Sequence, residues 1–345
     1  MRPLTLRRLL LQCFALLVIL FVVVVIAIKF GAVPVSLYAL GRDLWNVLLH
    51  QRSNISSDYV LIIQNIRLPR ILLGIMVGAS LSVAGASFQA LLRNPLADPY
   101  VLGVSSGAGL GAILALIVEP RVTLSPVFAA LLTPLGAFLG AAATVTVVYL
   151  LGRREGQIDS TTLLLGGVIT ASFISAIIMF LMSTLTGNLR GLSFWLMGDL
   201  STPLQKSVYW FLGIGFLVAS GAIYTTASDL NLLLAGEKEA MHLGVDVPRV
   251  RLVVYIAASL LTGLAVSVSG AIGYVGLIVP HVMRLIFGSD HRTLLPTAAI
   301  GGAIAVVFAD TLARTVVAPN ELAVGAVTAV VGAPLFIYLL RRRLA

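Results

Sequence analysis

The sequence predicts an all-α polytopic membrane protein with about ten transmembrane helices. Of its 345 residues 59% are hydrophobic and 11% are charged, whereas soluble domains average about 25% charged residues. The mean hydropathy is +1.04, and the apolar runs approach the roughly 20 residues that a membrane-crossing helix requires. Ten such runs and their connections use the whole length, so we expect one transmembrane domain over residues 1–345.

The first half of the chain contains five expected spans and one unusual interruption. The apolar run after Arg7 and Arg8 exceeds the core of about 7–15 residues that signal peptides carry, so we interpret it as a retained first span. A proline-bearing break at residues 93–99 separates the second and third spans, and it is either a pathway-lining element or a plain turn. The five ranges are 9–28, 68–92, 100–118, 127–151 and 161–185.

The second half contains five further spans around a polar segment at residues 229–250. A short surface helix is expected within 186–206, and the spans cover 207–226, 251–270, 271–287, 294–313 and 322–340. Residues 229–250 combine charges with helically spaced apolar residues, so they cannot lie in lipid and belong at one membrane face. They form either an ordinary solvated loop or the contact with a separate motor protein.

The distribution of positive charge predicts the orientation. Fourteen of the 23 lysines and arginines fall on the side of the two termini and nine on the other. Positive residues favour the cytoplasmic side, so both termini and residues 229–250 are expected in the cytoplasm of a multi-pass protein of the cytoplasmic (inner) membrane. The net charge of +9 forms no basic stripe, which argues against nucleic-acid binding.

Three arginines on the opposite side stand out because that side should be poor in them. Arg67 and Arg70 precede the second span and Arg314 ends the ninth, four residues after Asp310, so a local ion pair is possible. They are either interfacial anchors or a docking surface for an acidic partner.

Several other function classes find little support. None of Lys29, Lys206 and Lys238 completes a Walker A loop. The four histidines are dispersed and Cys13 is the only cysteine, so no metal site and no bound cofactor are expected. The acidic residues fall near span ends, which disfavours an ion-coupled secondary transporter. No catalytic cluster supports an integral-membrane enzyme, although both alternatives stay open.

Three stretches resemble the FecCD-type permease subunits of ABC importers for vitamin B12, haem and ferric siderophores. They are RLPRILLGIMVGASLSVAGASFQALLRNPLADPYVLGVSSGAGLGA at 67–112, GAIGYVGLIVPHVMRLIFGSDHRTLLP at 270–296, and ADTLAR with ELAVGAVTAVVGAPLFIYLLRR at 309–342. The resemblance implies the type II ABC importer fold and import of a large metal chelate. It implies a homodimer, two cytoplasmic ATPase subunits that bind the ATP, and a periplasmic or lipid-anchored substrate-binding protein outside.

The resemblance also implies roles for particular residues of this chain. The loop between spans 6 and 7 would form two short helices that fit the ATPase, and the outer arginines would meet glutamates of the binding protein. The break after span 2 and the start of span 5 would form the cytoplasmic gate. The implied residues are Gly236, Glu237, Ala240, Leu243 and Gly244 for ATPase coupling, Arg67, Arg70 and Arg314 for docking, and Asn94, Leu96, Ser160 and Thr161 for the gate.

Overall fold

The computed structural model describes residues 5–31, 61–119, 125–154, 157–158, 160–184, 189–202 and 204–344. Within them the chain is helical apart from a two-stranded hairpin that pairs Arg153 with Ile158. The elements are α1 Leu6–Lys29, η1 Ile63–Arg67, α4 Leu68–Leu91, η2 Pro99–Leu102, α5 Val104–Val118, α6 Pro126–Gly152, β1 Arg153–Arg154, β2 Gln157–Ile158, α7 Ser160–Thr184, α8 Leu189–Leu196, α9 Lys206–Thr225, α10 Ala227–Ala235, α11 Glu237–His242, α12 Val247–Ser269, α13 Val275–Phe287, α14 His291–Thr315 and α15 Val324–Leu344.

A helix is present at each of the ten expected spans. Seven helices of the described residues are long and apolar enough to cross a membrane, and three shorter apolar helices, α5, α13 and the apolar part of α15, stand at the third, eighth and tenth positions. This confirms the all-helical class and is consistent with ten spans, although the number itself stays a prediction, as does the assignment of 1–345 to one domain. The expected surface helix within 186–206 corresponds to α8.

Three helix starts differ from the prediction by four residues, and one of them is α13, which was expected from residue 271 and begins at Val275. The third span was expected from residue 100, but residues 99–102 form the short helix η2 and α5 begins only after Gly103, whose φ is 74°. The seventh span was expected from residue 251, but α12 begins at Val247, where Asp246 accepts a hydrogen bond from the Arg249 backbone N–H at 3.2 Å. The polar segment at 229–250 is therefore partly the first turn of a span.

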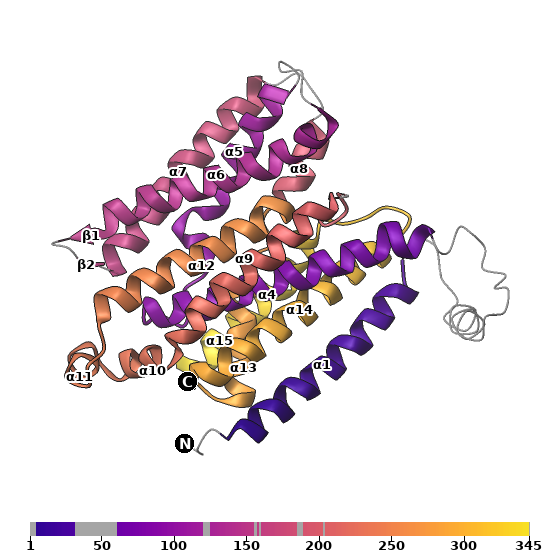
Figure 1. The fold of residues 1–345 in the computed structure, drawn as a ribbon. Coiled ribbons are helices and arrows are strands. Elements are labelled where there is room, and N and C mark those ends of the chain that lie inside the picture. The colour runs from indigo at the N-terminus through magenta and orange to yellow at the C-terminus, as the bar shows by residue number, and fades with distance from the viewer. Residues whose placement is uncertain are drawn as a thin grey trace.

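α4 occupies the centre of the bundle, between α14 on one side and α12 on the other, while α5 and α6 form a tightly packed pair (Figure 1). Glycines permit this packing: a Cβ on Gly78 would overlap the carbonyl of Gly302, and one on Gly107 would overlap Thr144 and the carbonyl of Gly140. Small residues let helices approach closely in lipid, where no hydrophobic force drives their association. Most of α4 and α12 is consequently buried.

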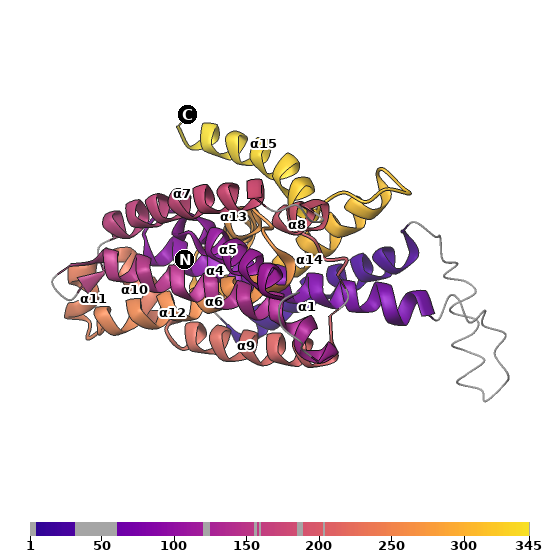
Figure 2. The same cartoon turned by 90° about the horizontal axis from the view of Figure 1, so that it is seen from above.

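Peripheral helices expose apolar side chains. α1 lies along the edge of the bundle against α14, and α15 extends away from it (Figures 1 and 2). Phe21 of α1, Phe173 of α7 and Val330 of α15 are each more than half exposed, as expected of surfaces that face lipid or another subunit. The start of α1 and the end of α15 lie at the end of the bundle that carries α10 and α11 (Figure 1).

Candidate functional site

The polar segment after α9 folds into two short helices joined by glycine. Gly236, at φ 154°, separates α10 from α11, and Gly244, at φ 86°, ends the turn after α11. Both φ values suit glycine because a Cβ disfavours them. Ala240 is fully buried, whereas Leu243 is 68% exposed. With Leu234 and Met241, which are nearly half exposed, Leu243 gives the segment an apolar outer surface.

Hydrogen bonds hold this segment to the transmembrane helices. In α10, Asn231 donates from Nδ2 to Asp290 Oδ1 at 2.8 Å and accepts from the His291 backbone N–H at 2.9 Å. In α11, Glu237 Oε2 accepts from Arg251 Nη2 of α12 at 2.7 Å. Hydrogen bonds from the Arg292 side chain, and then from Asn231, outweigh partial burial and lower the pKa of Asp290 to about 2. These contacts make α10 and α11 an extension of α12 and α14.

The residues implied as a gate come from two neighbouring elements at this end of the bundle. Asn94 lies in the break after α4, where its Oδ1 accepts a hydrogen bond from the Leu96 backbone N–H at 2.9 Å. Thr161 is exposed in the first turn of α7, and the side chain of Ser160 lies outside the described residues. α7 packs against η2, the helix that follows the break. The role of these residues as a gate stays a prediction.

Asp98 and Tyr100 fix the break itself. Asp98 Oδ1 accepts from the Tyr100 backbone N–H at 2.9 Å and so caps η2. The Tyr100 hydroxyl in turn accepts from the backbone N–H of Ile272 at 3.1 Å, which ties η2 to the junction of α12 and α13. Burial, only partly offset by the Tyr100 N–H, raises the pKa of Asp98 to about 6. Sequence reasoning did not find the contact between Tyr100 and Ile272, because the two residues are 172 positions apart.

At the opposite end of the bundle the three predicted docking arginines are buried. Arg70 donates to Asp310 Oδ1 at 2.8 Å and to Glu321 Oε2 at 2.7 Å, and the predicted Asp310–Arg314 pair is present with 3.0 Å between Arg314 Nε and Asp310 Oδ2. Arg67, Arg70 and Arg314 are each at most 6% exposed. Their docking role stays a prediction.

Backbone carbonyls explain why two of these arginines stay inside. Arg67 Nη1 donates to the carbonyl of Ile28, and Arg314 Nη2 donates to that of Ala27 at 3.4 Å. Both carbonyls belong to the last turn of α1, where carbonyl oxygens lack a hydrogen-bond donor within the helix. This turn is also the negative end of the helix dipole. The arginines thus anchor α1 to η1 and α14, a contact that no local sequence pattern signals.

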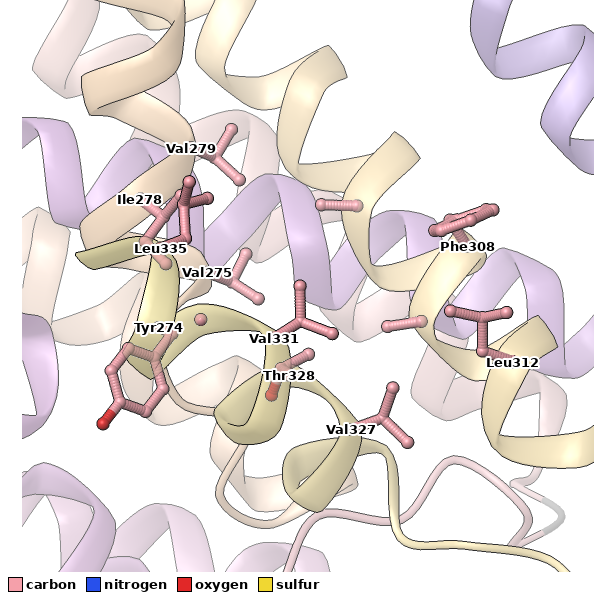
Figure 3. Close-up of a pocket in the computed structure, with 13 residues that line it drawn as sticks. Tyr274, Val275, Ile278, Val279, Phe308, Leu312, Val327, Thr328, Val331 and Leu335 are labelled. Carbon is pink, nitrogen blue, oxygen red and sulfur yellow. The ribbon is translucent and has the colours of Figure 1, made fainter. Parts of the chain in front are cut away.

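An apolar cavity of about 180 Å³ lies between α13, α14 and α15. Figure 3 shows Ile278 and Val279 from α13, Phe308 and Leu312 from α14, and Val331 from α15 around it. Hydroxyl groups enter the lining only through Tyr274 and Thr328. Over the part of the chain that the structure describes, no group of three or more His, Cys, Asp or Glu side chains could hold a metal ion.

Known proteins match nearly the whole chain. A profile of the FecCD transport family matches residues 17–342. The hemin transport system permease HmuU of Yersinia pestis is 40% identical over 336 residues, which is 95% of this chain and 94% of that protein. A cobalamin import permease, BtuC of Halobacterium salinarum, is 44% identical over 282 residues, 82% of this chain and 74% of that protein.

A solved structure shares the architecture. A metal-chelate type ABC transporter in an inward-facing conformation superposes with a TM-score of 0.78 and 30% sequence identity, over 96% of this chain and 99% of that one. The likeness therefore extends from the sequence to the arrangement of the helices.

Proposed function

Because the chain belongs to the FecCD transport family and is a permease subunit of an ABC importer, we propose that its cargo is a large metal chelate such as haem, a ferric siderophore or cobalamin. The single observation that carries this proposal is the match, over 82–97% of this chain, to permeases named for hemin, cobalamin and ferric citrate. The chain itself supplies helices, glycine contacts and apolar walls, and we assign it translocation and no catalysis.

The proposed assembly contains a second copy of the chain, two ATPase subunits that bind the ATP, and a substrate-binding protein. The exposed apolar residues of α10 and α11 support the ATPase contact, because such a surface beside charged groups is typical of a protein interface. At the other end of the bundle, Arg67, Arg70 and Arg314 would meet acidic residues of the binding protein, as the family resemblance implies. Both termini and α11 would lie in the cytoplasm.

The proposed cycle uses two states of one pathway. Binding-protein docking presents the chelate, ATP binding closes the ATPases, and α10 and α11 move with them. The contacts of α11 with α12 and of α10 with α14 support transmission of that movement into the spans. The binding protein and the nucleotide-bound ATPases would bind the two states with different affinities and so shift the populations of these states. The break at residues 93–99 and the start of α7 would open and close the cytoplasmic gate.

The test is uptake into proteoliposomes that contain the permease with its ATPase and binding protein. Cobalamin, haemin and a ferric siderophore are offered in parallel, each with ATP, without ATP and with an imposed proton or sodium gradient. We expect ATP-dependent uptake of one cargo, and only with the binding protein present. Uptake by the purified permease alone, driven by an ion gradient, would overturn the proposal in favour of a secondary transporter.

A further inference from the structure

Arg93 occupies a backbone position that normally belongs to glycine. α4 ends at Leu91, and the Asn94 N–H bonds to the Gln89 carbonyl at 3.1 Å while the Arg93 N–H bonds to the Ala90 carbonyl at 3.2 Å. This is the Schellman arrangement, in which the residue at the Arg93 position is left-handed and usually glycine. Arg93 has φ 49°, a conformation that a side chain disfavours. The arginine at this position therefore calls for an explanation in what its side chain contacts.

The side chain of Arg93 reaches the helix α11. Its Nη2 lies 3.6 Å from Oε2 of Glu237, the first residue of α11. The same oxygen accepts a hydrogen bond from Arg251 of α12 at 2.7 Å. Glu237 is 28% exposed, so its carboxylate is partly withdrawn from water and interacts with both guanidinium groups more strongly than it would in bulk solvent.

One carboxylate thus joins three elements: the end of α4, the start of α11 and the second turn of α12. The residues that follow Arg93 directly are Asn94, Pro95 and Leu96, which form the break implied as the cytoplasmic gate. A displacement of α11 relative to the end of α4 changes the distance between Glu237 and Arg93, and it acts on the break through a residue adjacent to the break. A glycine would satisfy the backbone here but would leave α11 without this connection.

We propose that Arg93 is a positioning residue that transmits the movement of α11 to the cytoplasmic gate through Glu237. This rests on the proposed function, because it requires that α11 contacts an ATPase. Arg93 touches neither cargo nor nucleotide in this role. Its removal should leave ATPase binding and hydrolysis in place and lower the amount of cargo imported for each ATP hydrolysed.

Arg93→Gly is the informative variant, because glycine suits the left-handed backbone and removes only the side chain. Arg93→Lys retains a positive charge, Glu237→Gln removes the negative one, and Arg153→Ala in β1 serves as the matched control for an exposed arginine at the same end of the bundle. The complete complex is reconstituted for each variant. ATP hydrolysis, cargo uptake, co-purification of the ATPase and the thermal unfolding midpoint are measured in parallel.

For Arg93→Gly we expect an unchanged or higher unfolding midpoint, full ATPase binding and about a fivefold lower ratio of uptake to hydrolysis, the factor that an ion-pair energy of about 1 kcal/mol represents. Arg93→Lys should recover part of the ratio, and Arg153→Ala should match the unmodified protein. In the Glu237→Gln background, Arg93→Gly should add little further loss, because the partner is already gone.

Two results would overturn the role assigned to Arg93. An unchanged ratio in Arg93→Gly shows that the contact transmits nothing, and loss of ATPase co-purification shows that Arg93 serves docking instead. Failure of the proposed function is a separate result, because the unmodified complex would then show no ATP-dependent uptake of any cargo offered.

Discussion

Arg70 is almost fully buried and is held by two carboxylates, Asp310 at 2.8 Å and Glu321 at 2.7 Å. Removal of one member of a buried ion pair costs about 3–5 kcal/mol, because the other charge stays behind without its partner. We predict that Arg70→Ala lowers the free energy of unfolding by about 3 kcal/mol. Glu321→Gln in the same chain should restore part of the loss, because Asp310 keeps Arg314 as a partner at 3.0 Å, whereas Glu321 has lost its pair with Arg70. Denaturant unfolding in detergent micelles measures both.

Lys206→Ala is the matched control for this prediction. The side chain of Lys206, the first residue of α9, is exposed. Lys206 lies at the same end of the bundle as Arg70, because Tyr209 of α9 donates a hydrogen bond to the carbonyl of Pro69. Exposed charges contribute at most about 1 kcal/mol. If Arg70→Ala and Lys206→Ala unfold at the same denaturant concentration, the ion cluster does not stabilise the fold.

A second prediction concerns the pH dependence of stability at the break after α4. Burial raises the pKa of Asp98 to about 6 in the folded protein, against about 4 in an unfolded chain. The folded state therefore holds this proton more tightly, so the contribution of Asp98 to stability is complete below pH 4 and is lost as the pH rises through 6.

Asp98→Asn keeps the oxygen that accepts the Tyr100 N–H bond and cannot ionise. We expect this variant to be more stable than the unmodified protein at pH 7, with the difference vanishing near pH 4. Thermal unfolding midpoints of both proteins between pH 4 and 8 give the comparison. Parallel curves for the two proteins would contradict the assignment of this titration to Asp98.

At the scale of helices, the contact between α4 and α14 depends on two facing glycines. A Cβ on Gly302 would overlap the Gly78 carbonyl, and one on Gly78 would overlap that of Gly302. We predict that Gly302→Ala forces α4 and α14 apart and lowers the unfolding midpoint. Gly221→Ala in α9 is the control, because a Cβ there meets no atom within 4 Å and alanine favours a helix. Equal midpoints for the two variants would show that the close approach is dispensable.

The helices were predictable because each depends on a local property, the length of an apolar run. α9 begins and ends within one residue of the range expected from the sequence. The predicted start of α12 was wrong because the helix already begins in a polar stretch, where Asp246 caps its first turn. Contacts between distant residues were not predictable: Arg70 and Asp310 are 240 positions apart. The burial of the three outer arginines follows from such distant contacts and was not predictable from the sequence, while their docking role stays a prediction.

At the scale of the whole molecule, the α10–α11 segment and the loop after α14 lie at opposite ends of the helix bundle. α14 begins at His291, beside Asn231 of α10, and ends near the loop that contains Asn320. Leu243 and Asn320 therefore stand at opposite ends, and both are exposed. The proposed orientation places Leu243 in the cytoplasm and Asn320 outside. In the proposed assembly, this arrangement would allow an ATPase and a binding protein to act on one permease at the same time.

Cysteine labelling tests the orientation directly, starting from Cys13→Ser, which removes the only cysteine. We predict that Leu243→Cys reacts with a membrane-impermeant maleimide in inverted vesicles and stays unlabelled in right-side-out ones. Asn320→Cys should give the reverse pattern, and detergent should make both reactive. The two positions lie at opposite ends of one bundle. Labelling of Leu243→Cys from outside together with Asn320→Cys from inside would therefore show that the protein has the opposite orientation. The ATPase and the binding protein could not then occupy the faces proposed for them.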